Sequence, residues 1–212
     1  MKKNNGLILS LMCYIVVFIM IQFGISLVAL YLDDSIKHPA SASPTALSLS
    51  SAVASIVIIG LFLWRKWSPV SRHYLQQHPW GVLVWTILAA LGAILPLQWI
   101  YEQLNITVAD NVKQLFDSIL GSRWGYLALG ILAPVAEELV FRGAILRCLL
   151  AYFNNRLPWI PIVVSALLFG AVHANLAQFV NASTMGLLLG WLYYRTHSVV
   201  PGVLFHWANN TV

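Results

Sequence analysis

Long apolar stretches, separated by short polar segments, run through the whole sequence. A helix needs about 20 mostly apolar residues to cross the hydrocarbon core of a bilayer, although it can be shorter or more polar where other helices surround it. The pattern predicts about seven crossings, over residues 6–31, 46–64, 80–100, 125–148, 159–174, 177–194 and 199–212. We therefore expect an all-α fold, a polytopic bundle of transmembrane helices.

The segments between these helices are too short to form further domains. Residues 32–45 contain two prolines and several serines and are typical of a linker, whereas residues 112–120 predict a short amphipathic helix. We expect a single membrane domain over residues 1–212. Within this domain, residues 1–79 supply the N-terminal helices and residues 80–212 carry the polar motifs described below.

The composition is that of a membrane protein. Hydrophobic residues make up 59% of the chain and charged residues only 9%, and the mean hydropathy is +0.77. The first apolar run is longer than the core of a signal peptide, about 7–15 residues, so we expect it to be retained as a helix. Cys13 and Cys148 lack the spacing of a metal knuckle or a redox pair, and we interpret them as packing residues.

The positions of the charges predict the orientation of the bundle. The formal net charge of +5 is spread over short loops, so it indicates topology and no nucleic-acid partner. With the N-terminus in the cytoplasm, the cytoplasmic side holds Lys2, Lys3, Arg65, Lys66, Arg72, Arg147, Arg156 and Arg195. The outer side holds Lys37, Lys113 and Arg123, together with Asp33, Asp34, Glu102, Asp110 and Asp117. This bias follows the positive-inside rule and predicts a multi-pass protein of the cell membrane with a cytoplasmic N-terminus.

Two acidic residues, Glu137 and Glu138, lie within a predicted membrane helix. Ionisable groups at such positions cost several kcal/mol unless they are paired or solvated, so they indicate a functional site. Glu138 and Arg142 are four residues apart on one helix face and are expected to form an ion pair. Glu137 points about 100° away from Glu138, and its carboxylate is therefore available to another partner.

Two further apolar segments carry an imidazole each. His173 lies near the end of one segment, and His206 and Asn210 are one helical turn apart on another, with Asn209 as an alternative polar neighbour. Counted from the cytoplasmic helix ends at about 1.5 Å per residue, Glu137 lies about 15 Å deep, His206 about 12 Å and His173 about 20 Å. These depths are compatible with one shared site.

The three motifs, taken in order, resemble those of a known family. Glu137-Glu138-x-x-x-Arg142, Phe169-x-x-x-His173 and His206-x-x-x-Asn210 look like the signature of the CPBP family, which comprises type II CAAX prenyl endopeptidases and bacteriocin-processing or self-immunity proteins. The resemblance covers residues 80–212, the expected catalytic core. It implies an intramembrane glutamate-dependent endopeptidase acting on a membrane-associated peptide or protein near the cytoplasmic side of the bilayer.

The resemblance also implies a role for each residue. Glu137 and His173 would activate a water molecule, His206 and Asn210 would stabilise the oxyanion, and the Glu138–Arg142 pair would orient the helix or tune Glu137. Glu137, His173 and His206 are also an accepted ligand set for catalytic zinc, but the H-E-x-x-H spacing is missing. We expect chemistry without a cofactor, with zinc on these three residues as the alternative.

Two other classes of function fit the same sequence. The first is a non-enzymatic bacteriocin self-immunity protein or membrane scaffold, whose polar residues serve helix packing and whose Gly186 and Gly190 offer a G-x-x-x-G surface to a partner helix. The second is a small transporter or proton relay that uses Glu137 and the two histidines as a pathway. Cleavage of a peptide would separate the peptidase from both.

Overall fold

The computed structural model describes residues 2–38, 41–69, 71–107, 110–153, 156–173 and 175–211. Over these ranges the chain forms helices and turns and no strand, which confirms the all-α class. The helical elements are α1 (Lys2–Leu32), α2 (Pro44–Trp64), α3 (Arg72–Gln76), α4 (Trp80–Gln103), α5 (Asp110–Leu120), η2 (Tyr126–Leu132), α6 (Ala133–Glu138), η3 (Leu139–Leu146), α7 (Arg147–Tyr152), α8 (Trp159–Ala171), α9 (Leu176–Thr196) and α10 (Val200–Thr211). The amphipathic helix expected around residues 112–120 is present as α5.

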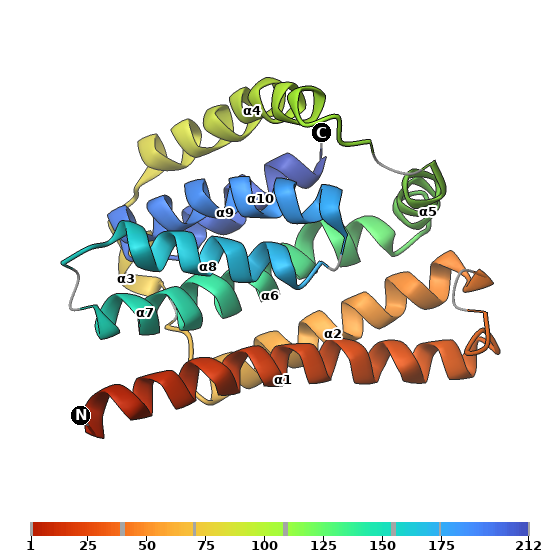
Figure 1. Cartoon of the computed structure of the whole chain (residues 1–212), viewed down its shortest axis with the longest axis horizontal. Helices are drawn as coiled ribbons and strands as arrows, with labels where there is room; N and C mark the ends of the chain where they lie inside the picture. The colour runs from red at the N-terminus through yellow and green to blue at the C-terminus, as the bar shows by residue number, and fades with distance from the viewer. Residues whose placement is uncertain are drawn as a thin grey trace.

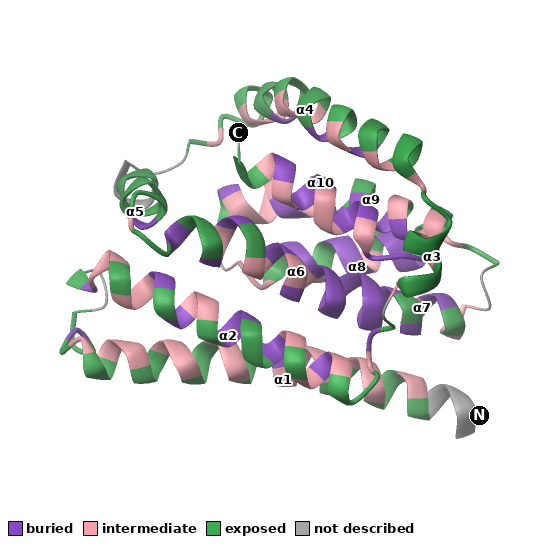
Figure 2. Cartoon of the chain, turned by 180° about the vertical axis from the view of Figure 1, so that it is seen from behind, coloured by how far each residue is buried: buried purple, intermediate pink, exposed green. Residues whose placement is uncertain are grey.

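The long helices are stacked in layers (Figure 1). α1 packs along α2 on one side of the bundle, and α4 packs against α10 on the opposite side. α6, α8, α9 and α10 lie between these two sides, and Figure 2 shows that the buried residues concentrate there, whereas α1 and α4 expose much of their surface. The centre of the bundle is therefore formed by the helices that carry the three motifs.

Within the described part of the chain, three helices are long and apolar enough to cross a membrane: the part of α1 from Gly6 to Leu32, α2 and α4. Apolar side chains on these helices are freely exposed, for example Leu9 at 70% and Leu95 at 75%. Such surfaces suit a lipid environment and would be unfavourable in water. The length and the apolar surfaces of these helices thus show that the chain is a membrane protein.

The predicted count of about seven crossings is not confirmed. Helical segments occur at all seven predicted positions, but α8 has 13 residues and α10 has 12. At about 1.5 Å per residue these two helices are about 20 and 18 Å long, less than the roughly 30 Å of the hydrocarbon core. Both lie against other helices of the bundle: α8 packs on α9, and α10 packs on α4 and α9.

The helix with the two glutamates is one continuous path from Tyr126 to Tyr152, called here the motif helix. Its central part, α6, is flanked by η2 and η3, whose turns are of the wider π type. Pro134 lies where η2 meets α6, and its missing N–H removes one bond of the α-helical ladder. π-Helical turns are rare and often mark functional sites, and the apolar pattern alone did not predict them.

The G-x-x-x-G of α9 packs against α8 of the same chain. A Cβ atom added to Gly186 would lie 2.9 Å from Cα of Ala166, and one added to Gly190 would lie 3.0 Å from Cγ2 of Ile162. The glycines therefore allow the two helix backbones to approach closely. Because α8 already covers this surface, it is not free for a partner helix, contrary to the scaffold hypothesis.

Candidate active site

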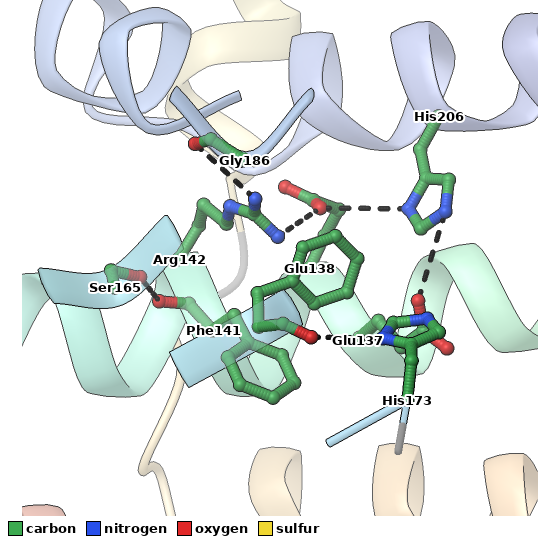
Figure 3. Close-up of polar contacts among 9 residues, drawn as sticks. Glu137, Glu138, Phe141, Arg142, Ser165, His173, Gly186 and His206 are labelled. Carbon is green, nitrogen blue, oxygen red and sulfur yellow. Dashed lines mark hydrogen bonds and ion pairs between the residues drawn. The ribbon is translucent and has the colours of Figure 1, made fainter. Parts of the chain in front are cut away.

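Glu138 and Arg142 form the ion pair that their spacing predicts. Nη1 of Arg142 donates to Oε1 of Glu138 at 2.8 Å, and both side chains are fully buried (Figure 3). Nη2 of Arg142 donates to the carbonyl of Gly186 at 3.4 Å, and its guanidinium lies 4.4 Å from the centre of the Phe169 ring. The arginine thus links the motif helix to α8 and α9.

Gly202 lets α10 come close to Glu138. A Cβ atom at this position would lie 2.5 Å from Oε2 of Glu138, an oxygen that has no hydrogen-bond partner among the described residues. The small residue therefore leaves room for the buried carboxylate. Gly202 could not be identified from the sequence, since its role depends on how α10 packs.

His206 lies between the two carboxylates (Figure 3). Its Nε2 is 3.7 Å from Oε2 of Glu137, and its Nδ1 is 3.6 Å from Oε1 of Glu138. Both distances are too long for direct hydrogen bonds. They nevertheless place the imidazole close enough to both carboxylates for electrostatic interaction. Its ring packs edge-on against Phe169 with the ring centres 5.7 Å apart. Glu137 differs from Glu138 in keeping 15% of its side chain exposed.

His173 lies two residues after Ala171, the last residue of α8. Its Nδ1 lies 2.9 Å from the backbone carbonyl of Phe169. A carbonyl oxygen only accepts hydrogen bonds, so this contact favours the tautomer with a proton on Nδ1. Nε2 of a neutral His173 is then a free acceptor, which is the state that a base requires.

Asn210 projects from the last turns of α10. Its Nδ2 donates to the carbonyl of Leu129 in η2 at 3.2 Å, so one N–H of the amide is engaged with the motif helix and the second is available. Asn209 lies beside it, at the same cavity. The structure thus leaves both asparagines as candidates for the polar neighbour of His206.

These residues meet in one cavity of about 410 Å³. Its lining includes the predicted site residues Glu137, His173, His206 and Asn210, and amides that the sequence analysis missed, Gln178 and Asn181. Glu138 and Arg142 do not line it and lie behind it in the protein interior. Four of the six predicted residues therefore face a shared space, and the other two support it.

A second cavity, of about 610 Å³, lies on the α1 side of Glu137 and His173. Both residues line the two cavities, as do Phe116 of α5 and Gln178 of α9. The wall from α1 carries Gln22 and Ser26, which are also one helical turn apart. In the sequence, Gln22 stands out only as a polar residue in an apolar helix. Its place in the cavity wall depends on how α1 packs, which the sequence does not show.

The arrangement gives no support to a metal centre. Among the residues that the structure describes, no three His, Cys, Asp or Glu side chains are placed to hold one metal ion. Glu138 is engaged by Arg142, and Nδ1 of His173 by a backbone carbonyl. The zinc set of Glu137, His173 and His206 stays an untested alternative.

The comparison with protein families matches the C-terminal part of the chain. Residues 119–212 match the model of the Rce1-like family, described as type II CAAX prenyl endopeptidase Rce1-like. The matched region contains all six predicted site residues, and it leaves α1, α2 and α4 outside.

Two curated proteins are similar over part of their length. The chain is 25% identical over 130 residues to the UPF0177 protein YbdI of Lactococcus lactis subsp. lactis (strain IL1403), covering 61% of this chain and 68% of that protein. It is 27% identical over 103 residues to the protein named "Putative membrane peptidase YdiL" of Bacillus subtilis (strain 168), covering 49% of this chain and 41% of that protein. No solved structure matches the chain. The resemblance carried by the three motifs is thus confirmed for residues 119–212, which are similar to the Rce1-like type II CAAX prenyl endopeptidases.

Proposed function

We propose that this chain is a glutamate-dependent intramembrane endopeptidase that hydrolyses a peptide bond of a membrane-associated peptide or protein. The observation that carries the proposal is the single cavity lined by Glu137, His173, His206 and Asn210. The Rce1-like family match and the name of the Bacillus relative also point to a protease. The cell membrane is the expected location.

In this proposal Glu137 and His173 activate a water molecule. The water oxygen attacks the carbonyl carbon of the scissile bond while its proton passes to Glu137, and Nε2 of His173 accepts a hydrogen bond from the same water. The C–N bond then breaks, and the proton moves from Glu137 to the leaving nitrogen. The immediate products are a carboxylic acid and an amine, and the proton of the acid then passes to the amine, so one water is consumed for each bond cleaved.

His206 and Asn210 stabilise the negative charge that develops on the carbonyl oxygen. An imidazole N–H and an amide N–H are suitable donors, and they act most strongly in a site with little water. His206 is placed for this role between the two carboxylates, with its ring nitrogens 3.7 and 3.6 Å from Glu137 and Glu138. Glu138 and Arg142 position this imidazole ring from the protein interior, on the side away from the cavity.

Cleavage by purified protein tests the proposal. The protein is reconstituted in nanodiscs and given a library of membrane peptides, and wild type is compared with Glu137→Gln and His173→Ala. Loss of the base is expected to lower the cleavage rate about 10²- to 10⁴-fold. Matched controls are Glu102→Gln and His73→Ala, which change an exposed acid and an exposed imidazole outside the cavities.

The same assay with a chelator addresses the metal alternative. The proposed mechanism expects equal cleavage with and without the chelator. Loss of cleavage on chelation that added zinc restores would instead favour the zinc ligand set. Full cleavage by Glu137→Gln would reject Glu137 as the base.

A further inference from the structure

The two ends of the bundle differ in charge. One end, called the basic end, is where α1 and α4 begin and α2, α7 and α9 end, and the other, the acidic end, is where α1 and α4 end and α5 lies. The residues of the basic end are Lys2, Lys3, Arg65, Lys66, Arg72, Arg147, Arg156 and Arg195. Those of the acidic end are Asp33, Asp34, Lys37, Glu102, Asp110, Lys113, Asp117 and Arg123.

Contacts between distant segments hold each end together. At the basic end, Nη2 of Arg147 donates to the carbonyl of Trp67 at 2.7 Å, which joins the motif helix to the segment after α2. At the acidic end, the Tyr101 hydroxyl donates to the carbonyl of Ala177 at 2.7 Å, which joins the end of α4 to the start of α9. The separation of charge is thus a property of the folded bundle, as well as of the sequence.

Both cavities lie toward the acidic end. Their walls come from α5, through Phe116, from the first turns of α9, through Gln178, and from the second half of α1. His173 follows the end of α8 that lies on this side, and Asn210 is in the last turn of α10. Along the motif helix, Glu137 is also nearer to Tyr126 than to Tyr152, the residue at the basic end.

Lysine and arginine in short loops determine the orientation of a membrane protein, and they accumulate on the cytoplasmic side. Eight of them lie at the basic end and three, Lys37, Lys113 and Arg123, at the acidic end. The rule therefore places the basic end in the cytoplasm. The cavities then lie toward the opposite face of the membrane.

We propose that the active site opens on the outer, non-cytoplasmic face and that its substrate is a membrane-inserted or translocated polypeptide cleaved close to that face. The proposal rests on the proposed peptidase function and specifies its substrate class. A lipid-modified C-terminus presented from the cytoplasm would meet the basic end, away from Glu137. It also replaces the expectation of cleavage near the cytoplasmic side of the bilayer.

Cysteine labelling tests the orientation without any need for a substrate. Cys13 and Cys148 are first replaced by alanine, and single cysteines are then introduced as Phe116→Cys at the cavities and Gln76→Cys in α3 at the basic end. Both positions are exposed, and neither substitution alters a charge. Bacterial spheroplasts that carry each variant are treated with a membrane-impermeant maleimide before and after permeabilisation.

The expected result is labelling of Phe116→Cys in intact spheroplasts and of Gln76→Cys only after permeabilisation. The reverse pattern overturns the proposal, as does labelling of both in intact spheroplasts. Absence of labelling at Phe116→Cys under either condition overturns it too, because the cavity would not open to water. The labelling is repeated in Glu137→Ala, where the same pattern is expected, so a wrong orientation and a failed peptidase assignment are distinguished.

Discussion

Oε1 of Glu138 lies 3.6 Å from Nδ1 of His206 and at the same time accepts a hydrogen bond from Arg142 at 2.8 Å. This oxygen atom therefore connects the buried ion pair to His206, which lines the candidate active-site cavity. A change in the ion pair will therefore alter the electrostatic environment of His206, although neither Glu138 nor Arg142 lines the cavity.

Arg142→Met should destabilise the protein strongly. It removes the cation and leaves the Glu138 carboxylate buried without a charged partner, a change that typically costs about 3–5 kcal/mol. Thermal unfolding in detergent measures the loss. The double variant Glu138→Leu/Arg142→Met should recover most of the stability, because no charge then remains buried. Equal instability of the single and double variants would show that the pair contributes through packing and not through charge.

Gly186→Ala should also destabilise, by about 1–3 kcal/mol, because the new Cβ would overlap the backbone of α8. The atom would lie 2.9 Å from Cα of Ala166, and backbone cannot move aside as a side chain does. Gly60→Ala is the matched control, since a Cβ atom there meets nothing within 4 Å. Unfolding temperatures in detergent that fall equally in the two variants would contradict close packing of α8 and α9.

The local features of the site were predictable from the sequence. The spacing of Glu138 and Arg142 predicted their pair, and the rotation of about 100° per residue predicted that Glu137 faces elsewhere. Apolar runs also located every long helix. These inferences succeed because a single helix determines them.

Features that depend on how helices pack were not predictable. The position of His206 between two acids requires α10 to approach at Gly202, and the amides Gln22 and Gln178 reach the site only through the packing of α1 and α9. The hydrogen bond from the amide of Asn210 to the carbonyl of Leu129 likewise depends on how α10 packs against η2. Spacing within one segment carries no information on such contacts.

The loop after α1 should respond to acid through Asp33. Hydrogen bonds from the Ser43 hydroxyl, the Ser35 hydroxyl and the Ser43 backbone N–H hold the pKa of this carboxyl below its usual range. A lowered pKa in the folded state stabilises the fold at neutral pH, and the effect is lost as the pH falls through that pKa. The unfolding temperature of Asp33→Asn should therefore lie below that of wild type at neutral pH and approach it in acid. A difference that grows on acidification would contradict this assignment.

Gln22 should position the substrate from α1, outside the region matched by the Rce1-like family. Among the described residues its amide forms no hydrogen bond with the protein, and it lines the cavity shared by Glu137 and His173. An amide in a membrane helix is costly without a partner, and an extended peptide backbone offers both a donor and an acceptor. Gln22→Leu should lower kcat/KM about two- to tenfold, the effect of one hydrogen bond, mainly through KM.

The control on the same helix is Ser10→Ala, whose hydroxyl donates to the carbonyl of Gly6 and lines neither cavity. Gln22→Asn keeps the amide but shortens it, so partial recovery of KM is expected. A purely structural role for Gln22 predicts a different result: the unfolding temperature would fall with Gln22→Leu, and KM would stay at the wild-type value. Since α1 lies outside the family match, a substrate contact there would make the N-terminal helices a source of specificity for a C-terminal region that resembles Rce1-like proteins.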